Sequence, residues 1–339
     1  MNNLLGRMIF GILLVAGIAA GMLAYDYYYD HRKPNFSQEA VIYVRPGDSP
    51  AAVLDSVASK AGVLNRESLE RAFNRAGAPQ PGRYVVAPSM TSTAAARKLA
   101  KGWQDEMNLT IAPVFRTPED VADLLAGQLM VPAEEIAAAL KDKEVLAGYG
   151  FTPETALALI LPDTYRVKWT ISVKELLDRL YQEYQKYWNQ ERRSQAEQQG
   201  LTPVEAAILA SIVNEETKYQ PEMARVAGVY LNRLHAPGWK LQADPTVAYC
   251  FQYTLKRVLN RHLEYDSPYN TYMYEGLPPG MISCAPKACL EAVLHPSTEP
   301  NFYFCASPAL DGTHRFARTN AQHEANARAY RAALAKLGK

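Results

Sequence analysis

The chain has 339 residues, which is enough for two domains that each bury a core of their own. Its 36 basic and 35 acidic side chains leave a net charge of +1, which argues against nucleic acid as a partner. The 21 tyrosines are more than packing alone usually requires, and tyrosine suits surfaces that stack on sugars or peptides.

The first predicted element is an apolar helix over residues 8–25, preceded by a short segment of residues 1–7. At about 1.5 Å of rise per residue, this uncharged run is just long enough to cross a bilayer. A collar of tyrosines, typical of a membrane interface, starts at its last residue. A cleaved signal peptide is the alternative, because Arg7 and the small residues at 19–24 also fit that pattern. The length of the run and the tyrosines favour an uncleaved anchor.

An anchor also determines the expected compartment. Flanking charges give little help with orientation, because Arg7 lies on one side of the apolar run, and Arg32 and Lys33 lie on the other. Since the large remainder of the chain has to be exported, we expect a single pass through the cytoplasmic (inner) membrane, with a cytoplasmic N-terminus and a periplasmic main part. Residues 26–39 are largely polar and contain a proline, which predicts a linker.

Residues 40–108 predict a small subdomain that contains a strand–helix–helix–strand unit. Its elements are predicted at residues 40–45, 50–61, 65–76 and 83–87. The turn at Val44–Ser49 (VRPGDS) resembles the opening of LysM modules, which bind polymers of N-acetylglucosamine. A further helix at 93–103 and a strand at 108–114 lead into the rest of the chain.

A mixed α+β main domain is predicted over residues 109–339. Its predicted elements are helices at 117–129, 132–141, 172–199 and 320–337, a loop at 161–165 and a buried strand at 303–306. The cysteines are scattered, so we expect buried free thiols rather than a disulfide framework or a zinc site, with a Cys284–Cys289 bridge as the alternative.

One helix of this domain can present an acid. Thr202–Glu205 (TPVE) is a capping box with proline at the first helical position, and the residues that follow are apolar on nearly every face, which predicts a buried helix. Glu215 and Glu216 come at its C-terminal end. Burial and the helix dipole would both raise a carboxyl pKa there, as a general acid requires. From the helix alone, two glutamates that emerge into solvent are the more ordinary interpretation, and geometry does not distinguish them.

Polar and proline-rich segments follow at residues 241–247 (LQADPTV), 267–272 (SPYNTY) and 276–280 (GLPPG). Rigid polar loops after a carboxylate-bearing helix are how a protein builds an acid beside a long groove. We predict Asp244-Pro245-Thr246 to be a turn that positions its neighbours along this groove. The candidate substrate-binding residues are Gln242, Asp244, Thr246, Tyr269, Asn270, Thr271 and Tyr272.

Together, the anchor, the LysM-like unit, the helix and the loops resemble the YceG-like endolytic murein transglycosylases over most of the chain. That family has the same Tyr-Asn-Thr-Tyr and Gly-Leu-Pro-Pro-Gly runs and a Glu-x-Glu pattern on the helix, in which the second glutamate is catalytic. The second position falls on Glu216 and the first on Asn214, so one carboxylate of the pattern is missing here. The resemblance implies an α+β fold with one N-terminal transmembrane helix and a long substrate groove in the catalytic domain.

The resemblance implies lytic cleavage of peptidoglycan glycan strands by Glu216, acting as acid and then as base, with 1,6-anhydro ends as product. It also implies penicillin-binding synthases as partners, and no cofactor or metal is expected. A hydrolase of the muramidase type would need a second carboxylate, for which Asp163 and Asp244 are the candidates. A non-catalytic wall-binding adaptor is the other alternative, favoured by Asn214. His295, His314 and His323 lack metal-site spacing, which leaves them a structural or groove role.

Overall fold

The computed structural model describes residues 2–336, and side chains from residue 4. It is a mixed α+β structure, as predicted. Met1 and residues 337–339, with which the expected N-terminal segment and main domain begin and end, lie outside the described residues.

The described chain divides into two compact units. Unit 1 comprises the described residues up to Asn108 together with Tyr165–Ile171. Unit 2 comprises Leu109–Thr164 and the described residues from Ser172 onward. Three two-stranded sheets occur in the described part, formed by β1 with β2, β3 with β4 and β5 with β6.

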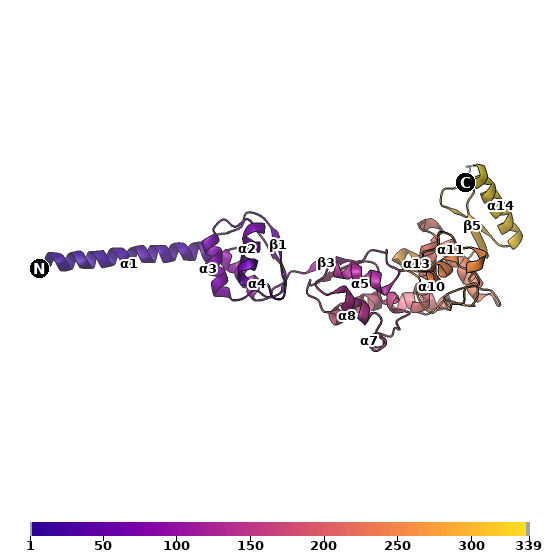
Figure 1. The fold of residues 1–339 in the computed structure, drawn as a ribbon, viewed down its shortest axis with the longest axis horizontal. Coiled ribbons are helices and arrows are strands. Elements are labelled where there is room, and N and C mark those ends of the chain that lie inside the picture. The colour runs from indigo at the N-terminus through magenta and orange to yellow at the C-terminus, as the bar shows by residue number, and fades with distance from the viewer. Residues whose placement is uncertain (1, 337–339) are drawn as a thin grey trace. The chain divides into compact units, whose positions relative to one another are not determined.

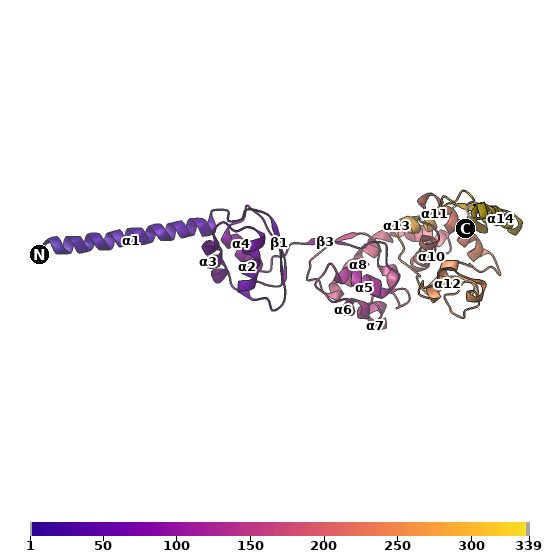
Figure 2. The same cartoon turned by 45° about the horizontal axis from the view of Figure 1, so that its top comes forward.

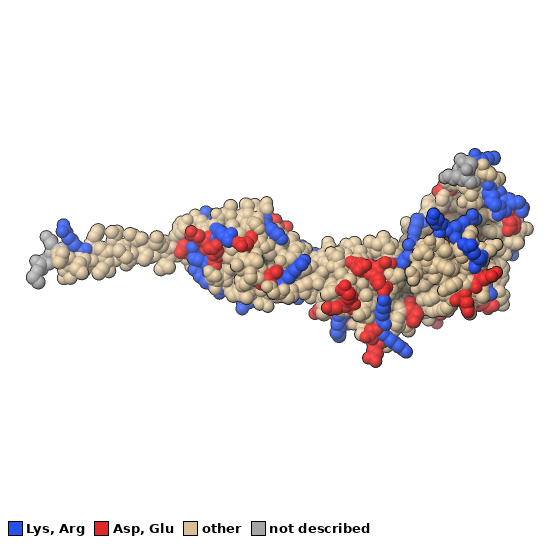
Figure 3. All heavy atoms as spheres, viewed as in Figure 1, with Lys and Arg blue, Asp and Glu red and all other residues tan. Residues whose placement is uncertain are grey.

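The first element, α1 (Asn2–His31), is one unbroken helix (Figures 1 and 2). It contains an apolar window of mean hydropathy 2.2 in which no residue is buried, and Figure 3 shows most of the helix as uncharged surface. Among the described residues, α1 is the one helix long and apolar enough to cross a membrane. A signal sequence near an N-terminus meets the same criteria.

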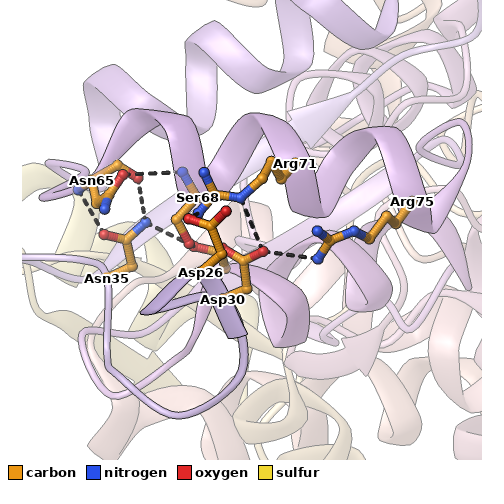
Figure 4. A network of polar contacts seen from close by, with 8 residues as sticks. Asp26, Asp30, Asn35, Asn65, Ser68, Arg71 and Arg75 are labelled. Carbon is orange, nitrogen blue, oxygen red and sulfur yellow. Dashed lines mark hydrogen bonds and ion pairs between the residues drawn. The ribbon is translucent and has the colours of Figure 1, made fainter. Parts of the chain in front are cut away.

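The end of α1 replaces the start of the predicted linker, because the helix continues to His31. Asp30 is fully buried and accepts hydrogen bonds from Arg71 Nη2 at 2.9 Å and from Arg75 Nη1 at 2.8 Å. Asp26, one turn earlier, pairs with Arg71 at 3.0 Å. Figure 4 shows these carboxylates facing the two arginines of α3 (Arg66–Ala76). The ion pairs hold the last turns of α1 in helical form against α3.

The folded part of unit 1 has the predicted strand–helix–helix–strand order. The elements are β1 (Ala40–Val44), α2 (Pro50–Lys60), α3 (Arg66–Ala76) and β2 (Gly82–Val86). The strands pair antiparallel, with Ala40 opposite Val86 and Val44 opposite Gly82. Both helices start as the sequence predicts, since side chains of Ser49 and Asn65 cap their first amides. The core is closed by α4 (Ser92–Ala100).

Two short strands follow in the chain, β3 (Met107–Thr110) and β4 (Thr164–Val167). β4 begins within the segment predicted as a loop. Between the two strands, unit 2 begins with α5, α6, α7 and the 3-10 helix η1. These elements span Pro118–Ala126, Ala133–Ala139, Lys143–Ala147 and Ala156–Leu159.

The long helix predicted at 172–199 is wrong, because it is two helices. They are α8 (Val173–Tyr187) and α9 (Gln190–Gln198). Trp188 leaves the helical conformation, with ψ of 58°, and buries its ring. Asn189 then starts the second helix by accepting a hydrogen bond from Arg192 N at 2.9 Å. A buried aromatic side chain and an N-cap residue together outweigh the helical periodicity here.

The core of unit 2 is a group of packed helices, in which α10, α11 and α13 contact one another. Their bounds, with those of α12 and the 3-10 helix η2, are Pro203–Glu216 (α10), Gln220–His235 (α11), Asp244–Cys250 (α12), Asn260–His262 (η2) and Lys287–Leu294 (α13). All four cysteines are free, and Cys284 and Cys289 are buried as expected, whereas Cys250 and Cys305 are partly exposed.

The chain ends in a hairpin and a helix. β5 (Tyr303–Ala306) and β6 (His314–Ala317) pair antiparallel, and α14 (Asn320–Lys336) packs on them (Figure 1). The strand predicted at 303–306 is present, but its residues are half-buried rather than buried. α14 has no buried residue along its described length.

Candidate active site

The end of α10 positions the candidate acid. Thr202 and Glu205 form the predicted capping box, in which Thr202 Oγ1 accepts from Glu205 N at 3.2 Å and Glu205 Oε2 accepts from Thr202 N at 2.7 Å. Every residue from Ala206 to Asn214 is buried, so the helix is fixed by packing on all sides. Its last two residues, Glu215 and Glu216, therefore have defined directions.

Glu216 lies in a cavity of about 540 Å³ in unit 2, which we call the Glu216 cavity. Tyr230 Oη donates a hydrogen bond to Glu216 Oε1 at 2.5 Å. Burial raises the pKa of Glu216 to about 7, against the lowering effect of the Tyr230 hydrogen bond. Nearby Asp244 raises the pKa further, and Arg233 lowers it. At neutral pH a substantial fraction of Glu216 is therefore protonated and able to donate a proton.

Glu215 has different surroundings from Glu216. Its carboxylate accepts a hydrogen bond from Arg116 Nη2 at 2.8 Å, and the Arg116 guanidinium lies 4.0 Å from the centre of the Tyr253 ring. Glu215 does not line the Glu216 cavity. The structure thus distinguishes Glu216 from Glu215, which helical geometry alone could not do.

The Glu216 cavity is lined by the start of α12, by α11, by the hairpin and by α14. The lining residues are Glu216, Tyr230, Arg233, Gln242, Asp244, Tyr272, Tyr303, Phe304, Cys305, Ala306, His314, Asn320, His323 and Glu324. Three of the predicted substrate-binding residues, Gln242, Asp244 and Tyr272, are among them. Tyr272 Oη donates to Asp244 Oδ1 at 2.6 Å. The predicted turn at residues 244–246 is instead the first turn of α12.

Three other predicted substrate-binding residues lie in the interior instead, because their polar groups satisfy the backbone of the loops. Asn270 is fully buried, and its Nδ2 donates to the carbonyl oxygens of Leu263 and Tyr265. Thr246 and Thr271 are buried with their hydroxyl oxygens 2.8 Å apart. These three side chains shape the loops rather than face the cavity.

Tyr269, the remaining predicted residue, lines a second cavity in unit 2, of about 590 Å³. We call it the tyrosine cavity, because Tyr249, Tyr253 and Tyr269 line it together with Arg116 and other residues. Glu216 does not line it.

Sequence reasoning missed the two side chains of α11 that complete the Glu216 cavity. Arg233 is buried, and it donates from Nε to Phe302 O at 2.7 Å and from Nη1 to Leu241 O at 2.6 Å. It therefore connects the segment before β5 with the segment before α12. Tyr230 is three residues earlier on the same helix face, and this spacing was the available signal.

The structure also shows the surroundings of Asn214 and His314, which the sequence analysis singled out. Asn214, which replaces the first glutamate of the family's Glu-x-Glu pattern, is buried, and its Nδ2 donates to Cys284 O at 3.2 Å. Its side chain therefore has a structural role. His314 lines the Glu216 cavity and bonds through Nδ1 to the buried Glu222 at 2.9 Å. Within residues 2–336, no group of three or more His, Cys, Asp or Glu side chains is arranged to hold a metal.

Known proteins with similar sequences carry a common description. An endolytic murein transglycosylase of Bacillus subtilis is 40% identical over 115 residues, which are 34% of this chain and 31% of the relative. An endolytic murein transglycosylase of Streptococcus pneumoniae is 24% identical over 354 residues, covering 94% of this chain and 63% of the relative. The chain therefore spans less than two thirds of the length of either relative.

The fold and the family are shown by two further matches. A crystal structure of a YceG-like protein from Listeria monocytogenes matches with a TM-score of 0.57 at 24% identity, covering 85% of this chain and 98% of that chain. This is a likeness of fold. The model of the YceG-like family matches residues 42–329, which confirms the resemblance predicted from the motifs. Since that match extends over most of its length, the chain belongs to the YceG-like family.

Proposed function

We propose that this chain is an endolytic lytic transglycosylase, a lyase that cleaves peptidoglycan glycan strands between N-acetylmuramic acid and N-acetylglucosamine. The observation that carries the proposal is Glu216, a carboxyl group that lines an open cavity and has a pKa raised by burial to about 7. The two relatives described as endolytic murein transglycosylases support the substrate and the reaction class.

In the proposed reaction, Glu216 acts twice. Its protonated carboxyl group gives a proton to the oxygen of the glycosidic bond, and the bond from the muramic acid C1 to that oxygen breaks. The carboxylate then takes the proton of the muramic acid C6 hydroxyl, whose oxygen forms a bond to C1. The products are a 1,6-anhydro end and a free hydroxyl on the leaving strand, and Glu216 is protonated again.

The neighbours of Glu216 suit this double role. Tyr230 occupies Oε1, which leaves Oε2 for the substrate. When Glu216 has lost its proton, the same hydroxyl stabilises the carboxylate. Gln242, Asp244 and Tyr272 supply amide, carboxylate and hydroxyl groups to the cavity, and these are the groups that recognise sugars.

A hydrolase is the second candidate function, and one observation favours it. Asp244 lines the same cavity as Glu216, so a second carboxylate is present near the acid. A hydrogen bond from Tyr272 Oη orients its carboxyl group. The products distinguish the two functions, because a hydrolase leaves a reducing end.

We propose further that α1 remains attached as a single membrane anchor with the folded units on the periplasmic side. The helix runs without a break from the apolar window into its ion pairs with unit 1, which supports this proposal. Such an anchor would hold the enzyme beside the penicillin-binding synthases that release new strands.

Unit 1 is proposed to be a LysM-like glycan-binding unit. Its strand–helix–helix–strand order supports the proposal, and so does a cavity of about 680 Å³. The start of α2 and the residues after α3 line this cavity, among them Ser49, Pro50, Gly77 and Ala78.

Mass spectrometry of purified glycan strands after digestion tests the proposed reaction. We expect products with 1,6-anhydromuramic ends from the wild-type protein and none from Glu216→Gln. Glu215→Gln is the matched control, and it should retain most of the activity because Glu215 does not line the Glu216 cavity. Reducing ends would establish the hydrolase instead. Strands that bind without being cleaved by the wild type would indicate an adaptor.

A further inference from the structure

The tyrosine cavity is a site for which the reaction at Glu216 gives no role. It has a volume of about 590 Å³ and lies wholly within unit 2. Side chains from the start of α5, from the end of α12 and from the loops after it line the cavity. Those that matter here are Arg116, Tyr249, Gln252, Tyr253, Ser267 and Tyr269.

Two elements contribute residues to both cavities, and a third contacts both of their linings. α12 places Asp244 in the Glu216 cavity and Tyr249 in the tyrosine cavity, and α12 packs beside α10 (Figure 2). Its seven residues span about 10 Å. The loop after η2 contributes Tyr272 to the first cavity and Tyr269 to the second.

The end of α10 connects the two cavities through one hydrogen bond. Glu216 lines the first cavity, and Glu215 holds Arg116, which lines the second. A polymer bound across Glu216 would therefore find the tyrosine cavity at the opposite end of a helix of only two turns.

The chemistry of the tyrosine cavity matches a sugar residue. The Tyr249 and Tyr269 rings both line the cavity, with their centres 4.6 Å apart, and so bring aromatic surface to it. Around them are hydrogen-bonding groups of Gln252, Ser267 and Arg116. A sugar ring likewise has apolar faces and a hydroxyl edge, so this combination of rings and polar groups fits it.

The charges favour a neutral occupant. Arg116 is paired with Glu215, and this hydrogen bond raises the pKa of the Arg116 guanidinium. The Asp120 carboxylate also lines the cavity. No uncompensated positive charge is therefore left in the lining to attract the carboxylates of a peptide, whereas a saccharide needs none.

The wall of the cavity is also held in shape. Gln252 and Tyr253 have φ of 53° and 55°, a left-handed conformation that is uncommon for side-chain-bearing residues. Tyr253 Oη donates to Ile282 O at 2.8 Å, which fastens this bend to the chain before α13. The cavity is thus preformed rather than dependent on binding.

We propose that the tyrosine cavity is a distal saccharide subsite, which binds a sugar residue of the glycan strand whose scissile bond lies at Glu216. The proposal rests on the proposed function and extends it. It makes the protein prefer strands long enough to occupy both cavities, which is a physical basis for cleavage within strands.

The test measures how affinity depends on strand length. The full chain in detergent, with Glu216→Gln to prevent cleavage, is titrated calorimetrically with peptide-free glycan oligosaccharides, from a disaccharide to lengths beyond eight sugars. Tyr249→Ala removes one ring of the subsite. Gln252→Gly removes an exposed amide at a position where glycine adopts the backbone conformation without strain, so it carries little risk of misfolding. Tyr274→Ala, at an exposed tyrosine that lines neither cavity, is the control.

We expect the ratio of long-strand to short-strand affinity to fall about tenfold with Tyr249→Ala and several-fold with Gln252→Gly, but not with Tyr274→Ala. An unchanged ratio in both subsite variants would overturn the proposal while the proposed function stands. The titrations are repeated with peptide-bearing strands, and a change seen only with these would assign the cavity to the peptide and overturn the saccharide subsite. If the Glu216→Gln protein binds no strand of any length, the proposed function fails, and the subsite fails with it.

Discussion

Two adjacent glutamates show how much the surroundings of a residue decide its chemistry. Glu216 accepts a hydrogen bond from the Tyr230 hydroxyl and lines a cavity. Glu215 accepts a hydrogen bond from Arg116 and does not line that cavity. Burial raises the pKa of the Glu216 carboxyl group to about 7, against the lowering effects of Tyr230 and Arg233. The proton needed for general-acid catalysis is therefore held at Glu216.

Tyr230→Phe tests whether Tyr230 positions and tunes Glu216. We expect kcat to fall about tenfold, because the hydroxyl stabilises the carboxylate formed during the reaction. The hydrogen bond lowers the pKa of Glu216, so its loss should raise that pKa. Activity requires the protonated acid, and its decline at high pH should therefore move to higher pH. The release of anhydro products measured from pH 5 to pH 9 checks this. A lower rate with an unmoved decline would mean that Tyr230 only packs.

Glu216→Gln should also change how stability depends on pH. The pKa of Glu216 is about 7 in the folded protein against 4.5 as its ordinary value, so the folded state binds the proton more tightly than the unfolded state. The contribution of Glu216 to stability is therefore fully present below pH 4.5 and is lost as the pH rises through 7. Relative to Glu216→Gln, the loss should be at most about 3 kcal/mol.

Urea unfolding of both proteins at pH 5 and pH 8 measures this difference. Glu205→Gln, which changes a partly exposed capping-box carboxylate outside the Glu216 cavity on the same helix, is the control. A wild-type protein that gains stability over Glu216→Gln between the two pH values would contradict the raised pKa.

The sequence was informative about Glu216 only through the family resemblance. The capping box at Thr202 and the apolar run predicted where α10 starts and that it is buried. Choosing between the two glutamates required the direction of each side chain, which depends on the packing of α10 against α11 and α13. Tyr230 and Arg233 were missed for the same reason, since a tyrosine and an arginine on a helix are common until their neighbours are known.

At the scale of elements, the short helix α12 determines the arrangement of the site. Its first residue, Asp244, lines the Glu216 cavity, and the backbone just before it is held by a buried threonine pair. Thr271 Oγ1 accepts a hydrogen bond from Ala243 N at 3.0 Å, and Gln242 N donates to Thr271 O at 3.0 Å. Gln242 has φ of 52°, so the chain turns sharply here and depends on these bonds.

Thr271→Val should therefore affect both stability and activity. The substitution keeps the volume but leaves the buried Ala243 N–H without its acceptor, which costs about 1–3 kcal/mol. We also expect a lower kcat, because Gln242 and Asp244 lose their fixed backbone. Thr254→Val, at an exposed threonine, should change stability by less than about 0.5 kcal/mol. Equal effects of the two variants in urea unfolding would show that the threonine pair does not hold α12.

Element types were predicted better than element ends. The strands and helices between residues 40 and 87 occur where alternation, turns and helical periodicity predicted them. The break at Trp188 was missed because it depends on burying the Trp188 ring. The helix at Asp244–Cys250 was missed because its start depends on hydrogen bonds to Thr271, which is distant in the sequence. Thr246, Asn270 and Thr271 were assigned to the substrate from their polar side chains, the predicted turn and the family's Tyr-Asn-Thr-Tyr run. In the structure their side chains form hydrogen bonds with the backbone and with one another.

At the scale of the whole molecule, the junction between α1 and unit 1 determines whether the proposed anchor is flexible or rigid. A linker was predicted from polar residues and a proline, but polar residues can also form a buried ion pair. Asp30 is fully buried between two arginines, whereas Asp26 is 39% exposed and pairs with one. A rigid junction would hold unit 1 at a fixed distance from the membrane.

Asp30→Ala tests this rigidity in the full chain reconstituted in detergent micelles. The variant leaves Arg71 and Arg75 without their buried carboxylate, which should cost about 2 kcal/mol. Because those bonds hold the last turns of α1, we expect amide hydrogen exchange there to become much faster, while exchange in the core of unit 1 changes less. Asp26→Ala removes an exposed partner of the same arginine, so exchange should remain close to that of the wild type. If both variants leave exchange slow, helix propensity alone sustains α1 up to His31. If exchange is already fast in the wild type, the junction is the flexible linker that the sequence predicted.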